Sequence, residues 1–211
     1  MLPINTDAPV YHFPYATIGL IATTTVTFII TGGGRSPYVD DWVLEYDQGL
    51  TPLQWISSVF AHAGIGHLIA NLIFLWGFGL VVEGKLGWVK FLGLFFLLAI
   101  LNGLLQQSVA GLFPNFSMGQ LGNSGVLYSL MAMSLVWAPL NEMTCFMLIG
   151  FHPYVFQVTI VFFSIFYVGI DFLLAWLFGF HWSSEMIHLS GAIVGFFVGI
   201  VMLKLNQVDC E

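Results

Sequence analysis

Four polar side chains in the apolar part of this sequence could together carry out acyl-transfer chemistry. Ser124 lies in Gly122-Asn123-Ser124-Gly125, where small neighbours allow another backbone to approach the hydroxyl. A serine hydroxyl is a weak nucleophile until a base takes its proton, and histidine is the usual base because its pKa lies near working pH. His188 is the candidate base. His67 and Asn71 are spaced i, i+4 on one helix face, and both can donate hydrogen bonds to a tetrahedral oxyanion.

Each of these residues, taken alone, has an ordinary structural explanation. A serine beside a glycine in a membrane helix is most often a packing position. A histidine at a helix start is more often a cap or an interface residue than a base. Independent packing roles do not predict that all four side chains share one depth, so their joint placement favours a functional site.

The composition predicts that lipid covers most of the molecular surface. Hydrophobic residues make up 58% of the 211 residues, charged residues 7%, and the mean hydropathy is +0.92, whereas a soluble domain carries about 25% charged side chains. Four basic residues stand against 11 acidic ones, so no basic patch indicates a nucleic-acid partner. No basic residue precedes an apolar run in the first 15 residues, which excludes the pattern of a secretory signal peptide.

Six apolar segments approach the roughly 20 residues that a helix needs to cross a bilayer core. The predicted spans are residues 15–31, 67–82, 88–108, 122–140, 155–179 and 186–205. They indicate an all-α membrane protein with one domain over residues 1–211. The tail after Leu205 ends without a clear terminus signal, so a missing C-terminal extension is an open alternative.

The even-numbered spans run in one direction, so their first turns lie at the same membrane face. His67 and Asn71 open the second span, Ser124 opens the fourth, and His188 lies one turn into the sixth. Polar residues in spanning helices are expensive and therefore functional candidates. The spacing alone predicts that these four side chains, from three helices, meet at one depth.

Small residues supply a route for two of these helices to approach. Gly191, Gly195 and Gly199 form a four-residue-spaced stripe on the sixth span, and such stripes allow close helix packing. Packing along this stripe against the fourth span brings His188 toward Ser124.

Two further polar residues remain ambiguous. Tyr128 lies four residues after Ser124, so its ring could pack on the imidazole of His188, with ordinary aromatic packing as the alternative. Asp171 is predicted in the middle of the fifth span, away from the outer ends of the even spans. We interpret it as a buried polar residue paired with a neighbouring helix, and the site as a Ser–His dyad.

The long segment between the first two spans is too polar to cross the membrane. Thr51-Pro52-Leu53-Gln54 predicts a helix start, with Thr51 as N-cap, Pro52 at the first position and Gln54 closing a capping box. We expect a short interfacial helix from Leu53 to Phe60, the alternative being a plain connecting loop.

The few basic residues predict the orientation. With a cytoplasmic N-terminus, Lys85, Lys90 and Lys204 fall inside and Arg35 falls outside, in agreement with the positive-inside rule. Six spans then return the C-terminus to the cytoplasm as well.

In combination, these residues resemble the rhomboid intramembrane serine proteases, from about Leu53 to Leu205. The matching stretches are Phe60-x-His62-x4-His67-x3-Asn71, Trp76-x-Phe78-Gly79-x3-Glu83-x3-Gly87, Gly122-x-Ser124-Gly125-x2-Tyr128 and His188-x2-Gly191-x3-Gly195. The departures are a missing Trp-Arg pair in the first loop, Asn123 in place of a small residue or proline, and Ile187 in place of alanine. None of them removes a catalytic group.

The resemblance implies a rhomboid-like six-helix bundle with a Ser124–His188 dyad. It implies an oxyanion hole formed by His67, Asn71 and the Ser124 amide, within a water-filled cavity open to the outer face, and no metal or cofactor. His62 is implied to shape the site from the loop side and Glu83 to anchor the cytoplasmic turn. Substrates are implied to be single-pass membrane proteins, and the location the bacterial inner membrane.

Two other functions remain as alternatives. A catalytically inactive rhomboid-like protein could bind membrane clients, but a pure binder does not need both Ser124 and His188. A channel or small transporter could place polar residues such as Gln106, Gln107 and Asp171 along a pathway. That reading expects polar groups spread through the membrane depth or broken helices in paired halves, and no inverted repeat is visible.

Overall fold

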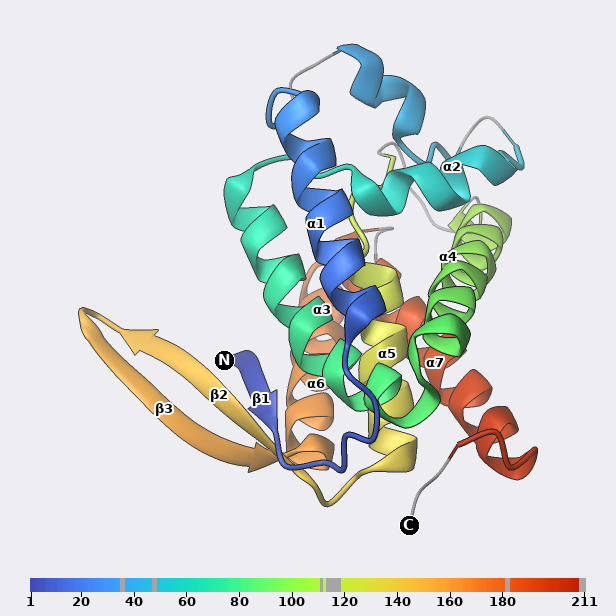
Figure 1. Ribbon diagram of the computed structural model, residues 1–211. Coiled ribbons are helices and arrows are strands. Elements are labelled where there is room, and N and C mark those ends of the chain that lie inside the picture. Colours follow the sequence, from blue (N-terminus) through green and yellow to red (C-terminus); the bar gives the residue numbers. More distant parts are fainter. Residues whose placement is uncertain (35–36, 47–48, 111, 113–118, 181–182, 209–211) are drawn as a thin grey trace.

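Apolar helices cross the molecule side by side, and a small sheet lies beside one end of them (Figure 1). The computed structural model describes residues 1–34, 37–46, 49–110, 112, 119–180 and 183–208. Its α-helices are α1 (Tyr15–Ile30), α2 (Pro52–Ser57), α3 (Ile65–Leu86), α4 (Trp88–Ala110), α5 (Ser124–Trp137), α6 (Ile160–Leu177) and α7 (Ser184–Lys204), and its 3-10 helices are η1 (Pro37–Trp42) and η2 (Ser58–Phe60).

The helix lengths agree with an integral membrane protein, and the predicted all-α class is confirmed. Helices α3, α4, α6 and α7 are long and apolar enough to cross a bilayer, and α1 and α5 are shorter apolar helices. Helix α5 has only 14 residues, of which 11 are buried, because α3, α4, α6 and α7 surround it. A helix that protein covers on all sides needs no match to the bilayer thickness.

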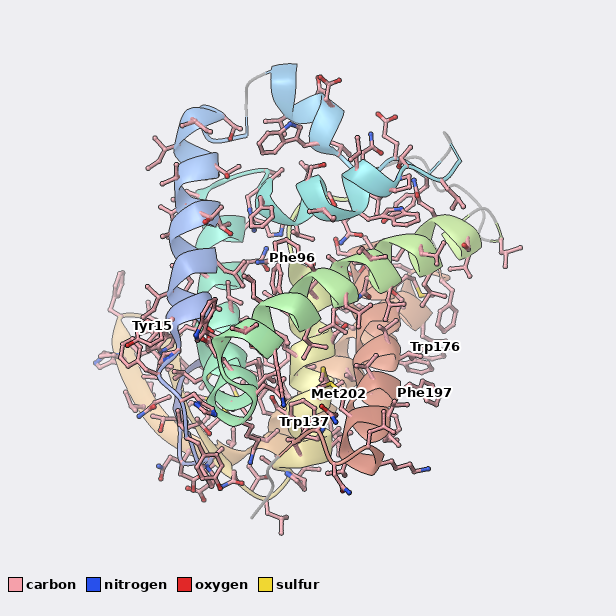
Figure 2. The ribbon with its side chains drawn as sticks, turned by 45° about the vertical axis from the view of Figure 1, so that its right-hand side comes forward. Tyr15, Phe96, Trp137, Trp176, Phe197 and Met202 are labelled. Atoms are coloured by element: carbon pink, nitrogen blue, oxygen red, sulfur yellow. The ribbon has the colours of Figure 1, made fainter. Side chains whose placement is uncertain are left out.

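Large side chains on the outer helices point away from the bundle (Figure 2). Trp176 on α6 and Phe197 on α7 are about 60% exposed, at 61% and 62%. Inside the bundle the indole N–H of Trp137 donates to the carbonyl of Gly199 at 2.9 Å. Apolar side chains thus fill the core and also form the outer surface of the bundle, as contact with lipid requires.

A three-stranded antiparallel sheet was not foreseen from the sequence. Its strands are β1 (Leu2–Thr6), β2 (Glu142–Ile149) and β3 (His152–Thr159), in the order β1-β2-β3. The fifth span was expected to begin at residue 155, but α6 begins at Ile160, because Val155 to Thr159 pair with β2. These residues are mostly β-branched or aromatic and fit a strand well. The apolar run therefore contains a strand followed by a helix.

Helix α2 lies across the upper end of the bundle (Figure 1), where the interfacial helix was expected. Its predicted capping box is wrong. Thr51 makes no side-chain cap to the helix backbone; instead its N–H donates to Oε1 of Gln107 on α4 at 3.1 Å, and Nε2 of Gln107 donates to its hydroxyl at 2.7 Å. A side chain from another helix therefore fixes the start of α2.

Glu83, near the end of α3, anchors the beginning of α1. Its fully buried carboxylate accepts hydrogen bonds from the backbone N–H groups of Ala16 and Thr17, at 2.8 and 2.7 Å, and from the Thr17 hydroxyl at 2.7 Å. The first N–H groups of a helix have no partner within the helix, and a negative charge there also complements the helix dipole. Gly79 lets Thr17 approach, since a Cβ on Gly79 would lie 2.5 Å from the threonine hydroxyl.

We predict that Glu83→Gln destabilises the protein by roughly 2–3 kcal/mol, because it removes a charge-assisted set of hydrogen bonds and leaves buried donors without a matching acceptor. Thermal unfolding in detergent measures the effect. Asp40→Asn, at an exposed acid in η1, is the control and is expected to leave the melting temperature unchanged. Equal melting temperatures for the two variants would contradict the anchoring role.

Candidate active site

The four predicted site residues line one cavity of about 550 Å³ near the upper end of the bundle. They come from α3, α5 and α7, the three helices whose first turns were expected to share a depth. The residues of this cavity that matter below are His67, Asn71, Ser124, Tyr128, Tyr167, Ile187 and His188. The structure therefore brings together the side chains that the sequence argument selected.

Gly122 lets the first turns of α3 close on the chain just before Ser124. Its φ of +99° is one that side-chain-bearing residues rarely adopt. A Cβ at this position would lie 2.8 Å from Cε1 of His67 and 3.0 Å from Nδ2 of Asn71. The Asn71 amide nitrogen is buried and has no hydrogen-bond partner among the described residues. Two potential donors are therefore held beside the backbone that leads into Ser124.

Ser124 is the first residue of α5, and its side chain is half-buried. The preceding Asn123 occupies the N-cap position but makes no side-chain cap, and both of its amide atoms are buried without a partner. The first N–H groups of α5 thus point toward the cavity end of the helix without intrahelical acceptors. Among the described residues no hydrogen bond joins Ser124 to His188; such bonds are often long in unliganded enzymes.

Helices α5 and α7 touch through their backbones. A Cβ on Gly191 would lie 2.2 Å from the carbonyl oxygen of Gly125, and one on Gly195 would lie 2.1 Å from that of Ser129. The hydroxyl of Ser129 also donates to the carbonyl of Gly191 at 2.7 Å. Small residues on both helices and this hydrogen bond hold the first turns of α5 and α7 side by side.

We predict that Gly191→Ala destabilises the protein by about 1–3 kcal/mol, because the added methyl group forces α7 away from a backbone carbonyl. Melting temperatures in detergent measure the loss. The matched control is Gly93→Ala in α4, where nothing lies within 4 Å of the new Cβ and a gain of up to about 1 kcal/mol is expected from helix propensity. A Gly191→Ala protein as stable as Gly93→Ala would contradict the close packing.

The imidazole of His188 has a partner on its face and another on its edge. The ring of Tyr128 stacks on it with centroids 4.2 Å apart and an interplanar angle of 9°. Its Nδ1 lies 3.2 Å from Oδ2 of Asp171 on α6. Both partners come from other helices, so three helices determine where the ring lies.

The predicted position of Asp171 is wrong. It was expected away from the outer ends of the even spans, but it lies level with His188. Asp171 lies six residues before the end of α6 at Leu177, which is the end of the helix nearest the site. His188 is one turn inside α7. Both side chains are therefore one to two turns from the same end of the bundle, whereas the expected bounds, residues 179 and 186, placed them at unequal depths.

His62 lies in the loop between η2 and α3 and is fully buried. Its ring centroid is 5.0 Å from that of His67. Burial and the nearby His67 lower the pKa of His62 to about 4, against weaker opposite effects of the Phe60 carbonyl and the Asn123 side chain. His62 is therefore neutral near neutral pH and supports the His67 side of the cavity without adding charge.

The pKa of His62 is lower in the folded than in the unfolded protein. The contribution of neutral His62 to the free energy of unfolding is therefore fully present above about pH 6.5 and is lost as pH falls toward 4. We predict that the melting temperature falls less over this window in His62→Gln than in the unmodified protein. His152→Gln, at an exposed position in β3, is the control. Parallel curves for all three proteins would contradict the burial effect.

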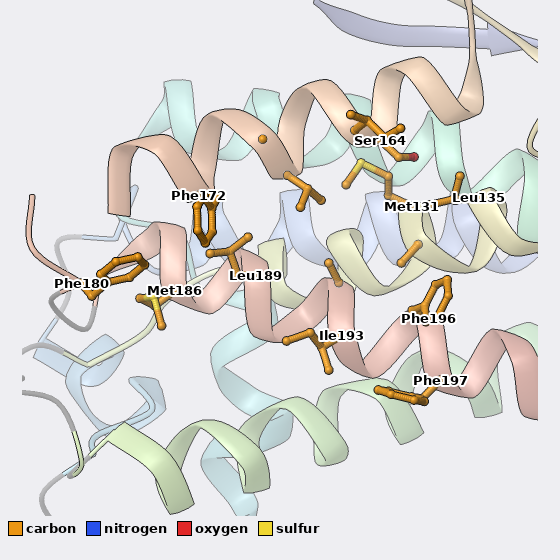
Figure 3. A pocket seen from close by; sticks show the side chains of 15 residues that line it. Met131, Leu135, Ser164, Phe172, Phe180, Met186, Leu189, Ile193, Phe196 and Phe197 are labelled. Carbon is orange, nitrogen blue, oxygen red and sulfur yellow. The ribbon is translucent and has the colours of Figure 1, made fainter. Parts of the chain in front are cut away.

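A second cavity, of about 710 Å³ and larger than the first, does not hold these residues. It is a groove between α6 and α7 with α5 at its floor, and nearly all its side chains are apolar, including Phe172, Leu189 and Phe196 (Figure 3). Its lining offers one hydroxyl, that of Ser164, and no ionisable group. Despite its size it is unsuited to catalysis. Within the described residues, no three His, Cys, Asp or Glu side chains gather as a metal site.

Comparison with known proteins identifies the family that this chain resembles. Residues 51–205 match the family model described as Rhomboid domain. Rhomboid protease GlpG of Haemophilus influenzae is 29% identical over 159 residues, which cover 75% of this chain and 73% of that protein. The proteins of the same name from Serratia proteamaculans and Yersinia pestis (strain Pestoides F) are 30% and 34% identical, over 60% and 64% of this chain. The matches span about half the length of these two relatives, 49% and 50%.

Proposed function

Since the chain belongs to the rhomboid family, we propose that it is an intramembrane serine endopeptidase with a Ser124–His188 dyad. The observation that carries the proposal is the single cavity lined by Ser124, His188, His67 and Asn71. Substrates are single-pass membrane proteins cut within or near their spanning segment. The relatives' shared name, Rhomboid protease GlpG, supports the reaction class.

The reaction begins with the hydroxyl of Ser124. His188 takes the Oγ proton while Oγ forms a bond to the scissile carbonyl carbon, and a tetrahedral oxyanion results. The protonated imidazole then gives this proton to the leaving amine as the C–N bond breaks. Water hydrolyses the acyl-enzyme by the same steps, with His188 again as base.

The oxyanion is stabilised by donors already present at the start of α3 and α5. The Nδ2 amide of Asn71 is buried without a partner, so it loses no existing hydrogen bond when it donates to a substrate. His67 and the backbone N–H of Ser124 complete the set. A single donor of this kind contributes about 3–4 kcal/mol to the transition state.

The short helix α5 supports cleavage inside the bilayer. With 14 residues it is about 21 Å long, roughly 9 Å shorter than a bilayer core of ~30 Å. Ser124 therefore lies below the membrane surface when the other end of α5 is at the opposite surface. The cavity above it gives water and an unwound peptide access to the hydroxyl.

The proposed location is the bacterial inner membrane, with both termini in the cytoplasm. The charges of Lys85, Lys90 and Lys204 support it, because these residues end α3, begin α4 and end α7, all away from the cavity. Arg35, the one basic residue expected on the outer side, lies outside the described residues. The site then opens toward the outer face.

The two alternatives explain the structure less well. An inactive client-binding protein has no need for the ring contacts that orient His188. A channel needs polar groups along the whole depth. Gln106 donates to Ser190 and Gln107 donates to Glu45 and Thr51, so both glutamines link segments of the bundle.

We predict that the purified protein, reconstituted in liposomes, cleaves a model single-pass substrate, and that Ser124→Ala or His188→Ala reduces cleavage to background. A serine-reactive fluorophosphonate is expected to label Ser124 in the unmodified protein and to label neither variant. The matched control is Ser134→Ala, on the same helix, where the buried hydroxyl bonds only to the Leu130 carbonyl; it is expected to keep both activities.

Unchanged cleavage in Ser124→Ala would refute the nucleophile assignment. Binding of the substrate with neither cleavage nor labelling in the unmodified protein would favour the inactive client-binding alternative. Ion flux through the liposomes without cleavage would favour the channel.

A further inference from the structure

Asp171 presents its carboxylate to the edge of His188. The distance from Oδ2 to Nδ1 is 3.2 Å, and the two side chains are 11% and 22% exposed. We propose that Asp171 is a positioning residue that extends the Ser124–His188 pair to an Asp–His–Ser triad within the membrane. The inference rests on the proposed function, because it assigns Asp171 a role in the same reaction.

The contact selects one tautomer of the imidazole. An ionised carboxylate is an acceptor only, so Nδ1 of His188 must carry the hydrogen that lies between the two groups. Nε2 is then unprotonated and free to accept the proton of Ser124. The opposite tautomer would leave Nδ1 and the carboxylate as two facing acceptors and would place a hydrogen on the atom that must act as base.

The contact also completes the orientation of the ring. Stacking on Tyr128 fixes the plane of the imidazole, but a ring held only by its face can still make a half-turn about its Cβ–Cγ bond, which exchanges its two edges. The hydrogen bond to Asp171 on α6 removes this rotation. Two helices, α5 and α6, therefore hold a base that belongs to a third, α7.

Within the described residues, the surroundings of the pair contain no lysine that could take the place of His188. The titratable groups that face it are His67 from α3, Tyr128 from α5, Tyr167 from α6 and Glu185 from α7. Lys85, Lys90 and Lys204 lie toward the opposite end of the bundle. A carboxylate in a spanning helix is costly unless it is paired. The charge that matches Asp171 therefore arises on His188 when the imidazole takes the proton of Ser124.

The contact between Asp171 and His188 determines where the protons lie before and during the reaction. In the resting state Asp171 is ionised, Nδ1 of His188 is protonated and Ser124 holds its own proton. As Oγ attacks, that proton moves to Nε2, and the imidazolium lies beside a carboxylate that was already charged and fixed in place. Asp171 stays ionised throughout, and the proton leaves with the amine. Such preorganised charge stabilises the transition state more than the ground state.

If Asp171 only held α6 against α7, any hydrogen bond between the two helices would be sufficient, and asparagine could also form one. The proposed role requires a carboxylate beside Nδ1 of His188. Asp171→Asn separates the two roles, because its amide can donate to Nδ1 and so stabilise the wrong tautomer. Asp171→Glu keeps the charge with a longer arm.

Cleavage kinetics in liposomes are the first test. In Asp171→Asn we expect kcat to fall about 10- to 100-fold, part of the contribution of a well-placed general base, with KM changed less than about twofold and the melting temperature kept. Asp171→Glu is expected to recover part of kcat. The matched control is Ser164→Ala, a buried hydroxyl on the same helix without a partner, which should leave kcat unchanged.

The second test needs no turnover. Proteins with ¹⁵N-labelled histidine, with the His188 signal assigned by its loss in His188→Ala, report the tautomer through the Nδ1 and Nε2 chemical shifts. We expect the Nδ1–H form in the unmodified protein and in Asp171→Glu, and a loss of that form in Asp171→Asn. Failure of the proposed function would show as absent cleavage and labelling in the unmodified protein, with this tautomer pattern still present.

The inference is overturned if Asp171→Asn retains the kcat of the unmodified protein, or if His188 keeps its tautomer without the carboxylate. It is also overturned if kcat falls only in proportion to folded protein and Asp171→Glu falls as far as Asp171→Asn. Each of these outcomes leaves the roles of Ser124 and His188 untouched, so the two proposals fail separately.

Discussion

The backbone contact between α5 and α7 is the constraint on which the site depends. Without a Cβ on Gly191 and Gly195, α7 lies against the carbonyl groups of Gly125 and Ser129. Ser124 and His188 are both anchored near this contact, one at the start of α5 and the other within the first turns of α7. In a lipid environment, where apolar packing offers little advantage over acyl chains, close approach and interhelical hydrogen bonds supply the association energy. The hydroxyl of Ser129 provides one such bond.

The third helix of the site contributes orientation more than proximity. Helix α6 packs on α7 beside a groove lined by apolar side chains (Figure 3), and its polar contact with α7 near this groove is Asp171 with His188. The α5–α7 contact decides how near His188, the proposed base, comes to Ser124, the proposed nucleophile. The α6–α7 contact decides which way the imidazole points.

The parts of the site that could be predicted from the sequence follow from the order of spans and from small residues. Parity placed His67, Asn71, Ser124 and His188 at one level, and they line one cavity. The glycine spacing indicated which helix face would approach α5. Both inferences need only helix direction and periodicity, which apolar segments reveal well.

Other features depended on contacts between distant segments and could not be predicted. The start of α6 was misplaced because Val155 to Thr159 are as apolar as a helix but pair with β2. The level of Asp171 was misjudged because α6 ends at Leu177 and α7 begins at Ser184, rather than at the expected residues 179 and 186. Gln107 takes over the capping of α2 from 56 residues away along the chain, which no local capping rule contains. In each case a partner from another element outweighed the local pattern.

The two ends of helix α3 differ in how their buried polar groups are hydrogen-bonded. At its final turn the carboxylate of Glu83 accepts three hydrogen bonds and is fully buried. At its first turns Nδ2 of Asn71 is also buried but has no partner. A buried polar group without a hydrogen bond destabilises the folded protein by about 1–3 kcal/mol. If Asn71 bound no ligand, an apolar residue at this position would therefore be at least as stable. The saturated end holds α1 in place, and in the proposed function the unsaturated end keeps a donor available for the charge that a reacting carbonyl develops.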